Sequence, residues 1–165
     1  MTKRNTRFRS IAVALLTATL LSLAGCEKRD PETGVLVEHA WVRLPAVAGG
    51  AAAGYFTATA GGDDALLAVS APRARVELHE TMSMGGAGAM GAMTGMRPIA
   101  NVALPANAPV RFTPGGKHLM IFGLDPKLKK GGTVNLIFRF RKAPPATAAA
   151  QLVGPADPPP GDAGS

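Results

Sequence analysis

Short apolar runs separated by turn-forming residues dominate the middle of the chain. Runs rich in Val, Ile, Leu, Phe and Thr occupy residues 35–44, 52–59, 65–71, 75–81, 99–104, 110–114, 118–124 and 133–140. Turn sequences such as GGDD, PGG and KKGG lie between them, and no segment keeps a helical period for more than a few turns. Successive strands without helices between them predict an all-β fold, an antiparallel sandwich or barrel.

The N-terminal segment has the composition of a leader rather than of a domain. Residues 1–25 begin with basic residues and continue into an apolar run at 11–23, which is the order of a secretory signal peptide. The following LAGC is similar to a bacterial lipobox, in which the cysteine, here Cys26, carries lipid. We therefore expect an exported lipoprotein, anchored at Cys26 on the periplasmic face of the envelope and joined to its domain by a polar tether, residues 26–34.

Cys26 is also the only cysteine in the chain. If its thiol carries lipid, the folded part has no disulfide, no cysteine zinc site and no thiolate copper centre. At the other end, residues 143–165 are mainly proline, alanine and glycine, with almost no large apolar side chains. Such a segment buries too little surface to offset the entropy of ordering, so it is predicted to be a disordered tail. The expected domain spans residues 35–142.

The formal charge of +7 does not indicate a nucleic-acid partner. Four of the eighteen cationic residues lie in the first ten positions, and beyond Gly25 the balance is 14 cationic against 11 acidic residues, or +3. That charge is small and scattered, so no phosphate-binding surface is expected. Neither a glycine-rich phosphate loop nor a nucleophile elbow is found, and the protein is not expected to be an enzyme.

Two strands carry residues suited to a metal. In the run 118–124, alternation places His118 and Met120 on one face, with their backbones about 7 Å apart. In the run 75–81, His79 shares a face with Glu77 and points outward if Leu78 faces the core. A histidine beside a thioether on a solvent-facing strand suits a soft ion. We expect Cu(I), with Cu(II) left open, because thioethers are poor ligands for zinc, calcium or magnesium.

The segment 77–98 holds five of the six methionines that follow the leader, and it is rich in glycine. These methionines exceed what one four-ligand site needs. Auxiliary metal ligands are therefore predicted among Met82, Met84, Met90 and Met93. The alternative interpretation is a slack insertion whose methionines pack as flexible fillers.

The sequences EHAWVR (38–43), AAAGYF (51–56), VELHET (76–81), MRP (96–98) and PGGKHLMIFGL (114–124) resemble the periplasmic PCuAC copper chaperones. In that family a methionine is followed by twenty-one residues and then HxM, as Met96 is here. The interval from His79 to Met96 is seventeen positions, five or six more than the family has, so Met90 or Met93 stays an alternative to Met96.

The resemblance implies a cupredoxin-like Greek-key sandwich with a Cu(I) site formed by His79, Met96, His118 and Met120. It also implies a monomer that passes copper to the dinuclear copper site of a respiratory oxidase subunit, with a Sco-type thiol protein as co-worker. Two other functions are also compatible with the sequence. One is a copper-buffering or resistance lipoprotein that binds more than one ion through the loop, and the other is a structural envelope lipoprotein without metal.

Overall fold

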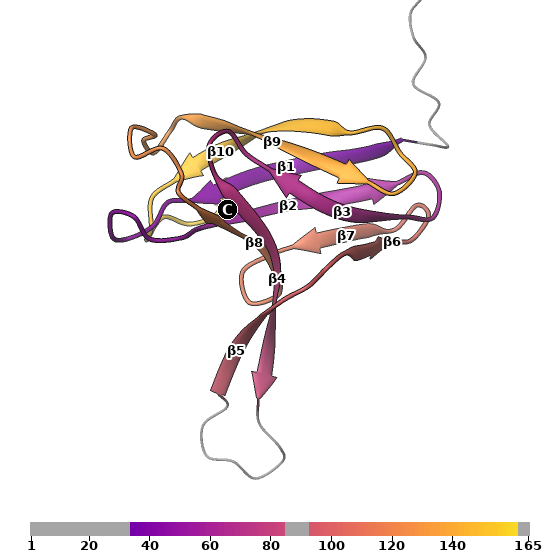
Figure 1. Ribbon diagram of the computed structural model, residues 1–165, viewed down its shortest axis with the longest axis horizontal. Coiled ribbons are helices and arrows are strands. Elements are labelled where there is room, and N and C mark those ends of the chain that lie inside the picture. Colours follow the sequence, from indigo (N-terminus) through magenta and orange to yellow (C-terminus); the bar gives the residue numbers. More distant parts are fainter. Residues whose placement is uncertain (1–33, 85–92, 162–165) are drawn as a thin grey trace, which may run out of the picture.

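In the computed structural model, the residues described are 34–84 and 93–161, and all of their regular structure is β-strand (Figure 1). The strands are β1 (Val35–Arg43), β2 (Ala52–Ala60), β3 (Asp64–Ser70), β4 (Arg75–Met84), β5 (Met93–Pro98), β6 (Val102–Leu104), β7 (Pro109–Phe112), β8 (Lys117–Phe122), β9 (Thr133–Phe140) and β10 (Ala146–Val153). Over these residues, no helix is long and apolar enough to cross a membrane. The expected all-β class is confirmed.

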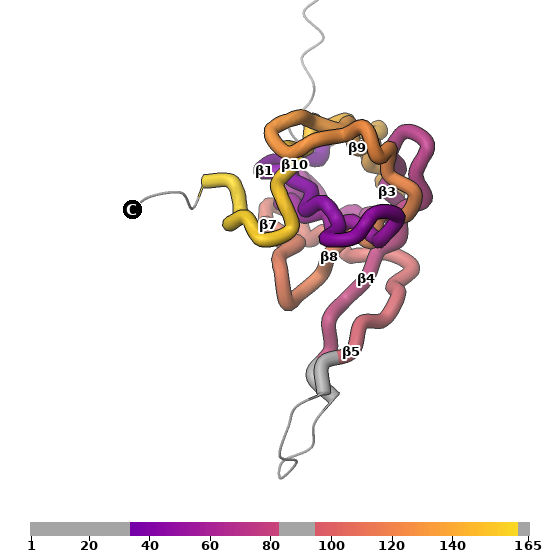
Figure 2. The backbone as a smooth tube through the Cα atoms, turned by 90° about the vertical axis from the view of Figure 1, so that its left-hand side faces the viewer, coloured from indigo at the N-terminus to yellow at the C-terminus, as the bar shows by residue number. Residues whose placement is uncertain are grey.

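The strands form one sheet in the order β5-β4-β8-β2-β1-β10-β9-β3-β6, with β7 paired to β2. All pairs are antiparallel except β1 with β10, which makes the sheet mixed rather than purely antiparallel. The sheet curls on itself, because β3 and β4 lie near opposite ends of this order and yet are joined by a tight turn at 71–74. Seen end-on, the strands form a closed outline from which the β4–β5 hairpin projects (Figure 2).

Three phenylalanines at the centre of the core come from strands that are distant in the sequence. Phe56 on β2 stacks on Phe112 of β7, with ring centroids 4.1 Å apart, and meets Phe138 of β9 edge-on at 4.8 Å. All three side chains are fully buried. Burial of a side chain of this size contributes about 1.5–3 kcal/mol, so this cluster joins the two sides of the curled sheet.

The prediction of a disordered tail from residue 143 is wrong for 146–153. These residues form β10, which pairs in parallel with β1 and antiparallel with β9, and its Ala150 and Leu152 are buried in the core. Small side chains suffice there because the neighbouring strands supply the bulk, and both backbone edges of β10 are hydrogen-bonded; tertiary context thus overrides a weak strand propensity. The domain therefore runs past residue 142, to at least Val153. The predicted leader, Cys26 and residues 26–33 of the tether lie outside the described residues, as do residues 162–165.

A β-bulge in β1 decides which side chains of this strand enter the core. The register with β2 shifts between Glu38 and Trp41, and His39 has a φ of 52°. One extra residue reverses the alternation, so Val42 enters the core while Trp41 packs on Tyr55 in a separate cluster, with ring centroids 4.3 Å apart. Because Phe56 faces the core, this aromatic pair lies on the opposite face of the sheet.

Candidate metal centre

Two histidines from neighbouring strands lie directly opposite each other. His79 of β4 pairs with His118 of β8 in the antiparallel register. Their neighbours Leu78 and Leu119 point into the core, so both imidazoles lie on the other face of the sheet, as the alternation predicts. The rings are not open to solvent, however, because His79 is only 8% exposed and His118 only 5%. They are the only buried polar or charged residues in the part of the chain that the structure describes.

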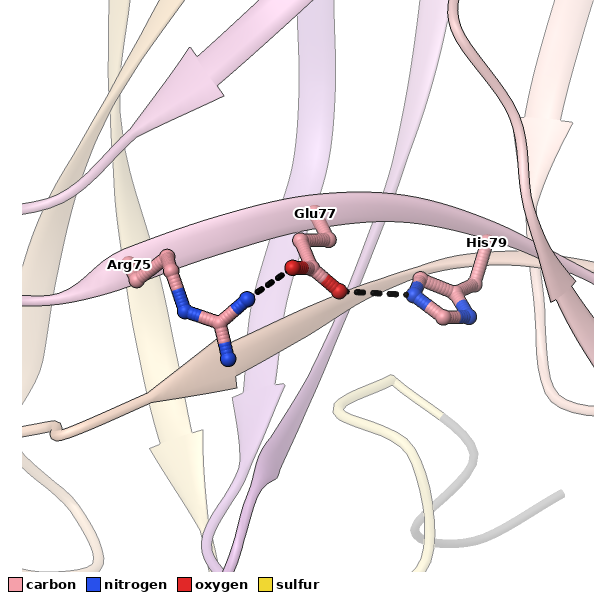
Figure 3. Close-up of polar contacts among 3 residues, drawn as sticks. All are labelled: Arg75, Glu77 and His79. Atoms are coloured by element: carbon pink, nitrogen blue, oxygen red, sulfur yellow. Dashed lines mark hydrogen bonds and ion pairs between the residues drawn. The ribbon is translucent and has the colours of Figure 1, made fainter.

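Each histidine has one ring nitrogen in a hydrogen bond and one without a partner. His79 Nε2 lies 3.0 Å from Glu77 Oε2 (Figure 3), and His118 Nδ1 lies 3.0 Å from the carbonyl oxygen of Gly116. The remaining atoms, His79 Nδ1 and His118 Nε2, are buried and have no hydrogen-bond partner among the described residues. An unsatisfied buried polar atom costs about 1–3 kcal/mol, so two on adjacent strands indicate a site that a ligand completes.

The spacing of the two rings suits a single ion between them. The ring centroids are 6.0 Å apart and the planes are inclined by 36°. An imidazole nitrogen binds a first-row metal such as zinc at about 2.0–2.1 Å, which places the centroids of two rings bound to one ion up to about 6 Å apart. Histidines that bind metals also donate their other N–H to a carboxylate or a carbonyl, the two kinds of partner found here.

The register brings two methionines to the face that carries the histidines. Met96 of β5 pairs with Thr81, which lies two positions beyond His79 on β4. Met120 lies two positions beyond His118 on β8. Positions two apart on a strand share a face about 7 Å apart, so Met96 and Met120 lie on the same face as the histidine pair. Met120 is half-buried, whereas Met96 is 62% exposed.

The other methionines of the segment lie elsewhere. Met82 is adjacent to Thr81 on β4 and therefore lies on the opposite face of the hairpin from Met96, with 41% of its surface exposed. Met84 and Met93 are register partners at the outer end of the hairpin. Their backbones lie about 17 Å along β4 from His79, against about 7 Å for that of Met96. Met90 lies outside the described residues.

The carboxylates near the histidines are already paired with cations. Glu77 accepts a hydrogen bond from Arg75, whose guanidinium lies 4.2 Å from the centroid of the Phe122 ring. Glu80 contacts Arg97 at 3.0 Å and Lys117 at 3.6 Å. The hydrogen bond from Arg97, helped by Lys117, holds the pKa of Glu80 below its usual value despite some desolvation. The structure thus brings two imidazoles, two thioethers and Glu77 to one face, whereas Glu80 lies on the other face of β4, where it binds cationic side chains.

No group of three or more His, Cys, Asp or Glu side chains suited to a metal is found in residues 34–84 and 93–161. Besides the histidines and Glu77, whose carboxylate contacts Arg75 and His79, the donors that lie on this face are the thioether sulfurs of Met96 and Met120. The two groups that hold the imidazoles were not predicted. The alternation that puts Glu77 on the face of His79 is the sequence feature that could have indicated their contact. No feature of the sequence indicates the contact between His118 and the Gly116 carbonyl.

The chain is similar in fold to solved structures of PCuAC domains. The chain is similar to the copper-bound PCuAC domain from PmoF2, with a TM-score of 0.59 and 24% identity over 74% of this chain and 96% of that one. The apo PCuAC domain from PmoF1 gives a TM-score of 0.58 and 24% identity, covering 74% of this chain and 97% of that one. The Cu(I) form of DR1885 from Deinococcus radiodurans gives a TM-score of 0.52 and 22% identity, covering 79% of this chain and 83% of that one. The fold is thus of the cupredoxin-like PCuAC type.

The sequence comparisons identify the family. The family model described as "Putative lipoprotein LpqE-like" matches residues 35–152, and its last residue falls in β10. A putative lipoprotein of Leifsonia xyli subsp. xyli is 32% identical over 151 residues, which cover 85% of this chain and 86% of that protein. The chain belongs to the LpqE-like family of putative lipoproteins.

Proposed function

We propose that the protein is a metallochaperone that binds Cu(I) at His79, Met96, His118 and Met120. The observation that carries the proposal is the buried histidine pair, in which His79 Nδ1 and His118 Nε2 lack partners and the rings lie 6.0 Å apart. The similarity in fold to PCuAC domains, among them a copper-bound domain and a Cu(I) form, supports the choice of copper.

The donor set favours Cu(I) over harder ions. Thioether sulfur is soft and neutral, and it binds Cu(I) readily together with imidazole. The ion is cargo in this proposal, so it must leave as well as bind. Met96 is 62% exposed whereas both histidines are buried, which lets an acceptor replace a thioether first while the imidazoles still hold the ion.

The acceptor and the cellular location belong to the same proposal. We place the protein outside the cytoplasmic membrane, held by lipid on Cys26, as a monomer that delivers copper to the dinuclear site of a respiratory oxidase subunit with a Sco-type thiol protein as co-worker. Membership of a family of putative lipoproteins supports the anchor, and the similarity in fold to PCuAC domains supports the delivery role. The role is that of a carrier, with no enzymatic step.

An anaerobic Cu(I) titration against a colorimetric chelator tests the proposal. The protein is the mature chain, residues 26–165, with Cys26→Ser so that it stays free of lipid. We expect one equivalent of Cu(I) to bind, binding to be lost in His118→Ala/Met120→Ala, and binding to be kept in His39→Asn. His39 is exposed and sits at the bulge with positive φ, a conformation that asparagine tolerates. Thermal unfolding of the metal-free variants checks that each one folds.

Two other results would contradict the carrier. More than one equivalent, with the surplus lost when Met82, Met84, Met90 and Met93 are changed to leucine, would favour copper buffering through the hairpin. No binding, and no stabilisation of the fold by Cu(I), would favour a structural lipoprotein. Transfer is tested separately, by mixing the Cu(I)-loaded chain with the soluble copper domain of an oxidase subunit, with and without a reduced Sco-type protein.

A further inference from the structure

Three side chains on one face of β4 form a connected row. Arg75, Glu77 and His79 occupy alternate positions, and Figure 3 shows the carboxylate of Glu77 between the other two. One carboxylate oxygen, Oε1, accepts a hydrogen bond from Arg75, and the other, Oε2, lies 3.0 Å from His79 Nε2. Arg75 is itself held over the ring of Phe122, 4.2 Å from its centroid. Glu77 is therefore fixed from one side and contacts the imidazole from the other.

The contact determines where the imidazole carries its proton. An ionised carboxylate only accepts hydrogen bonds, so Nε2 of His79 must be the protonated nitrogen. In a neutral ring the lone pair is then on Nδ1, which is the nitrogen that is buried without a partner. His118 has the opposite arrangement, since its Nδ1 donates to the Gly116 carbonyl and its Nε2 is left without a partner.

We infer that Glu77 is a positioning residue for the copper site: it holds His79 as the Nε2–H tautomer and reserves Nδ1 for the metal, while His118 binds through Nε2. The inference rests on the proposed function. It assigns to each histidine the nitrogen that faces the ion, and it gives a role to a carboxylate that is not itself a ligand.

Glu80 provides a matched control on the same strand. It is a second partly buried carboxylate of β4, and it is paired with Arg97 and Lys117 instead of with a histidine. Glu77→Ala and Glu80→Ala each remove one negative charge from β4, the first on the face of His79 and the second on the opposite face. Glu77→Gln separates charge from position, because its amide oxygen can still accept the Nε2 proton without carrying charge.

The test combines ring NMR with Cu(I) affinity, using the same lipid-free chain of residues 26–165. In the metal-free protein, ¹⁵N shifts of the imidazoles should show His79 as the Nε2–H tautomer and His118 as the Nδ1–H tautomer. On addition of Cu(I), which is diamagnetic, the shift should change at Nδ1 of His79 and at Nε2 of His118. Glu77→Ala should give a mixture of His79 tautomers and lower the Cu(I) affinity about 10–100-fold.

The control variants determine whether Glu77 affects the Cu(I) affinity through its hydrogen bond to His79 or through its charge. Glu80→Ala should leave the tautomers unchanged and lower the affinity by no more than about threefold, because its charge is paired with Arg97 and Lys117 on the other face. Glu77→Gln should recover most of the affinity. The inference is overturned if metal-free His79 is the Nδ1–H tautomer, if Cu(I) binds its Nε2, or if Glu77→Ala and Glu80→Ala have equal affinities. Failure of the unaltered chain to bind Cu(I) would instead overturn the proposed function, and the metal-free spectra would still show whether Glu77 sets the tautomer.

Discussion

His79 and His118 face each other across β4 and β8 with ring centroids 6.0 Å apart, and the hydrogen bonds of each ring leave one buried nitrogen without a partner. The histidines are held by the sheet, since both strands continue into the core through Leu78 and Leu119. The methionine on β5 is held by a projecting hairpin instead (Figure 1). The side chains proposed to bind copper thus come from two parts of the fold, the body of the sheet and the projecting hairpin.

Changes at Met96 and Met82 test whether a methionine of the hairpin must lie on the face of the histidines to bind Cu(I). Met96→Leu removes a thioether on the face of the histidines, and we expect the Cu(I) affinity to fall at least about tenfold, or about 1.4 kcal/mol. Met82→Leu alters the opposite face of the hairpin and should change the affinity by less than about threefold, or about 0.7 kcal/mol. The chelator titration measures both. Equal losses, or a larger loss in Met82→Leu, would exclude Met96 as the ligand from the hairpin.

Asp64 should make stability depend on pH. Its Oδ1 accepts hydrogen bonds from the N–H groups of Ala65, Arg141 and Lys142, and its Oδ2 accepts one from Ala143. Desolvation by burial raises the pKa of Asp64, but these backbone donors together outweigh it and hold the pKa below the usual value. A lowered folded-state pKa stabilises the protein above the unfolded-state pKa of about 4, and this stability is lost as the pH falls through the folded-state pKa.

We therefore expect Asp64→Ala to lower the free energy of unfolding by about 2 kcal/mol at pH 7, and to flatten its decline below pH 5. Asp64→Asn should lose less, because its amide oxygen still accepts the hydrogen bonds made to Oδ1. Urea denaturation at several pH values measures these effects. Asp125→Ala, which removes one exposed hydrogen bond to the N–H of Lys127, serves as the control. The same acid sensitivity in Asp64→Ala and in the parent would contradict the assignment.

Gly54 allows β2 to approach β8 closely behind the histidine pair. A Cβ at this position would lie 3.1 Å from both Cβ and Cδ1 of Leu119, the residue between His118 and Met120. We expect Gly54→Ala to destabilise the fold by about 1–3 kcal/mol through overpacking, as measured by urea denaturation. Leu119→Ala removes the contact with Cδ1 but keeps the one with Cβ. The loss of stability in Gly54→Ala/Leu119→Ala should therefore be smaller than the sum of the losses in the two single variants. Strict additivity would show that the contact with Leu119 is not what destabilises Gly54→Ala.

Truncation at two points separates β10 from the residues that follow it. A chain that ends at residue 145 lacks the strand that bridges β1 and β9, and it should show no cooperative thermal unfolding transition. A chain that ends at residue 161 keeps β10 and also Asp157, whose carboxylate accepts a hydrogen bond from the N–H of Gly154. It should unfold within a few degrees of the full chain. Circular dichroism distinguishes the two, and a folded chain that ends at residue 145 would show that β10 is dispensable.

Alternation of apolar and polar residues was sufficient to predict most of the strands, and the observed β9 spans the predicted residues 133–140. The same alternation placed His79 and His118 on the face away from the core. It failed at β10, where the neighbouring strands β1 and β9 cover the small Ala150 and bury Leu152. It also missed β5, a strand of the projecting hairpin whose sequence MTGMRP has no alternation of apolar residues.

The histidine contacts depend on cross-strand register, which alternation does not specify. The pairing of His79 with His118 depends on how far β8 slides along β4, and a shift of one residue would place a histidine opposite a leucine. Alternation also does not predict the bulge at His39, which moves Trp41 out of the core. The sequence therefore indicates which residues are available for a metal site, while the register determines which of them meet.

The interior position of β10 also affects how the protein folds. Trp41 and Gln151 are register partners although 151 − 41 = 110 positions separate them. Contacts between residues so distant in the chain slow folding, because a long loop must close before they form. Until β10 arrives, β1 and β9 each present an edge with unpaired backbone groups, which favours pairing with other chains. A nascent chain therefore stays open to aggregation until β10 has been made and can pair with β1 and β9.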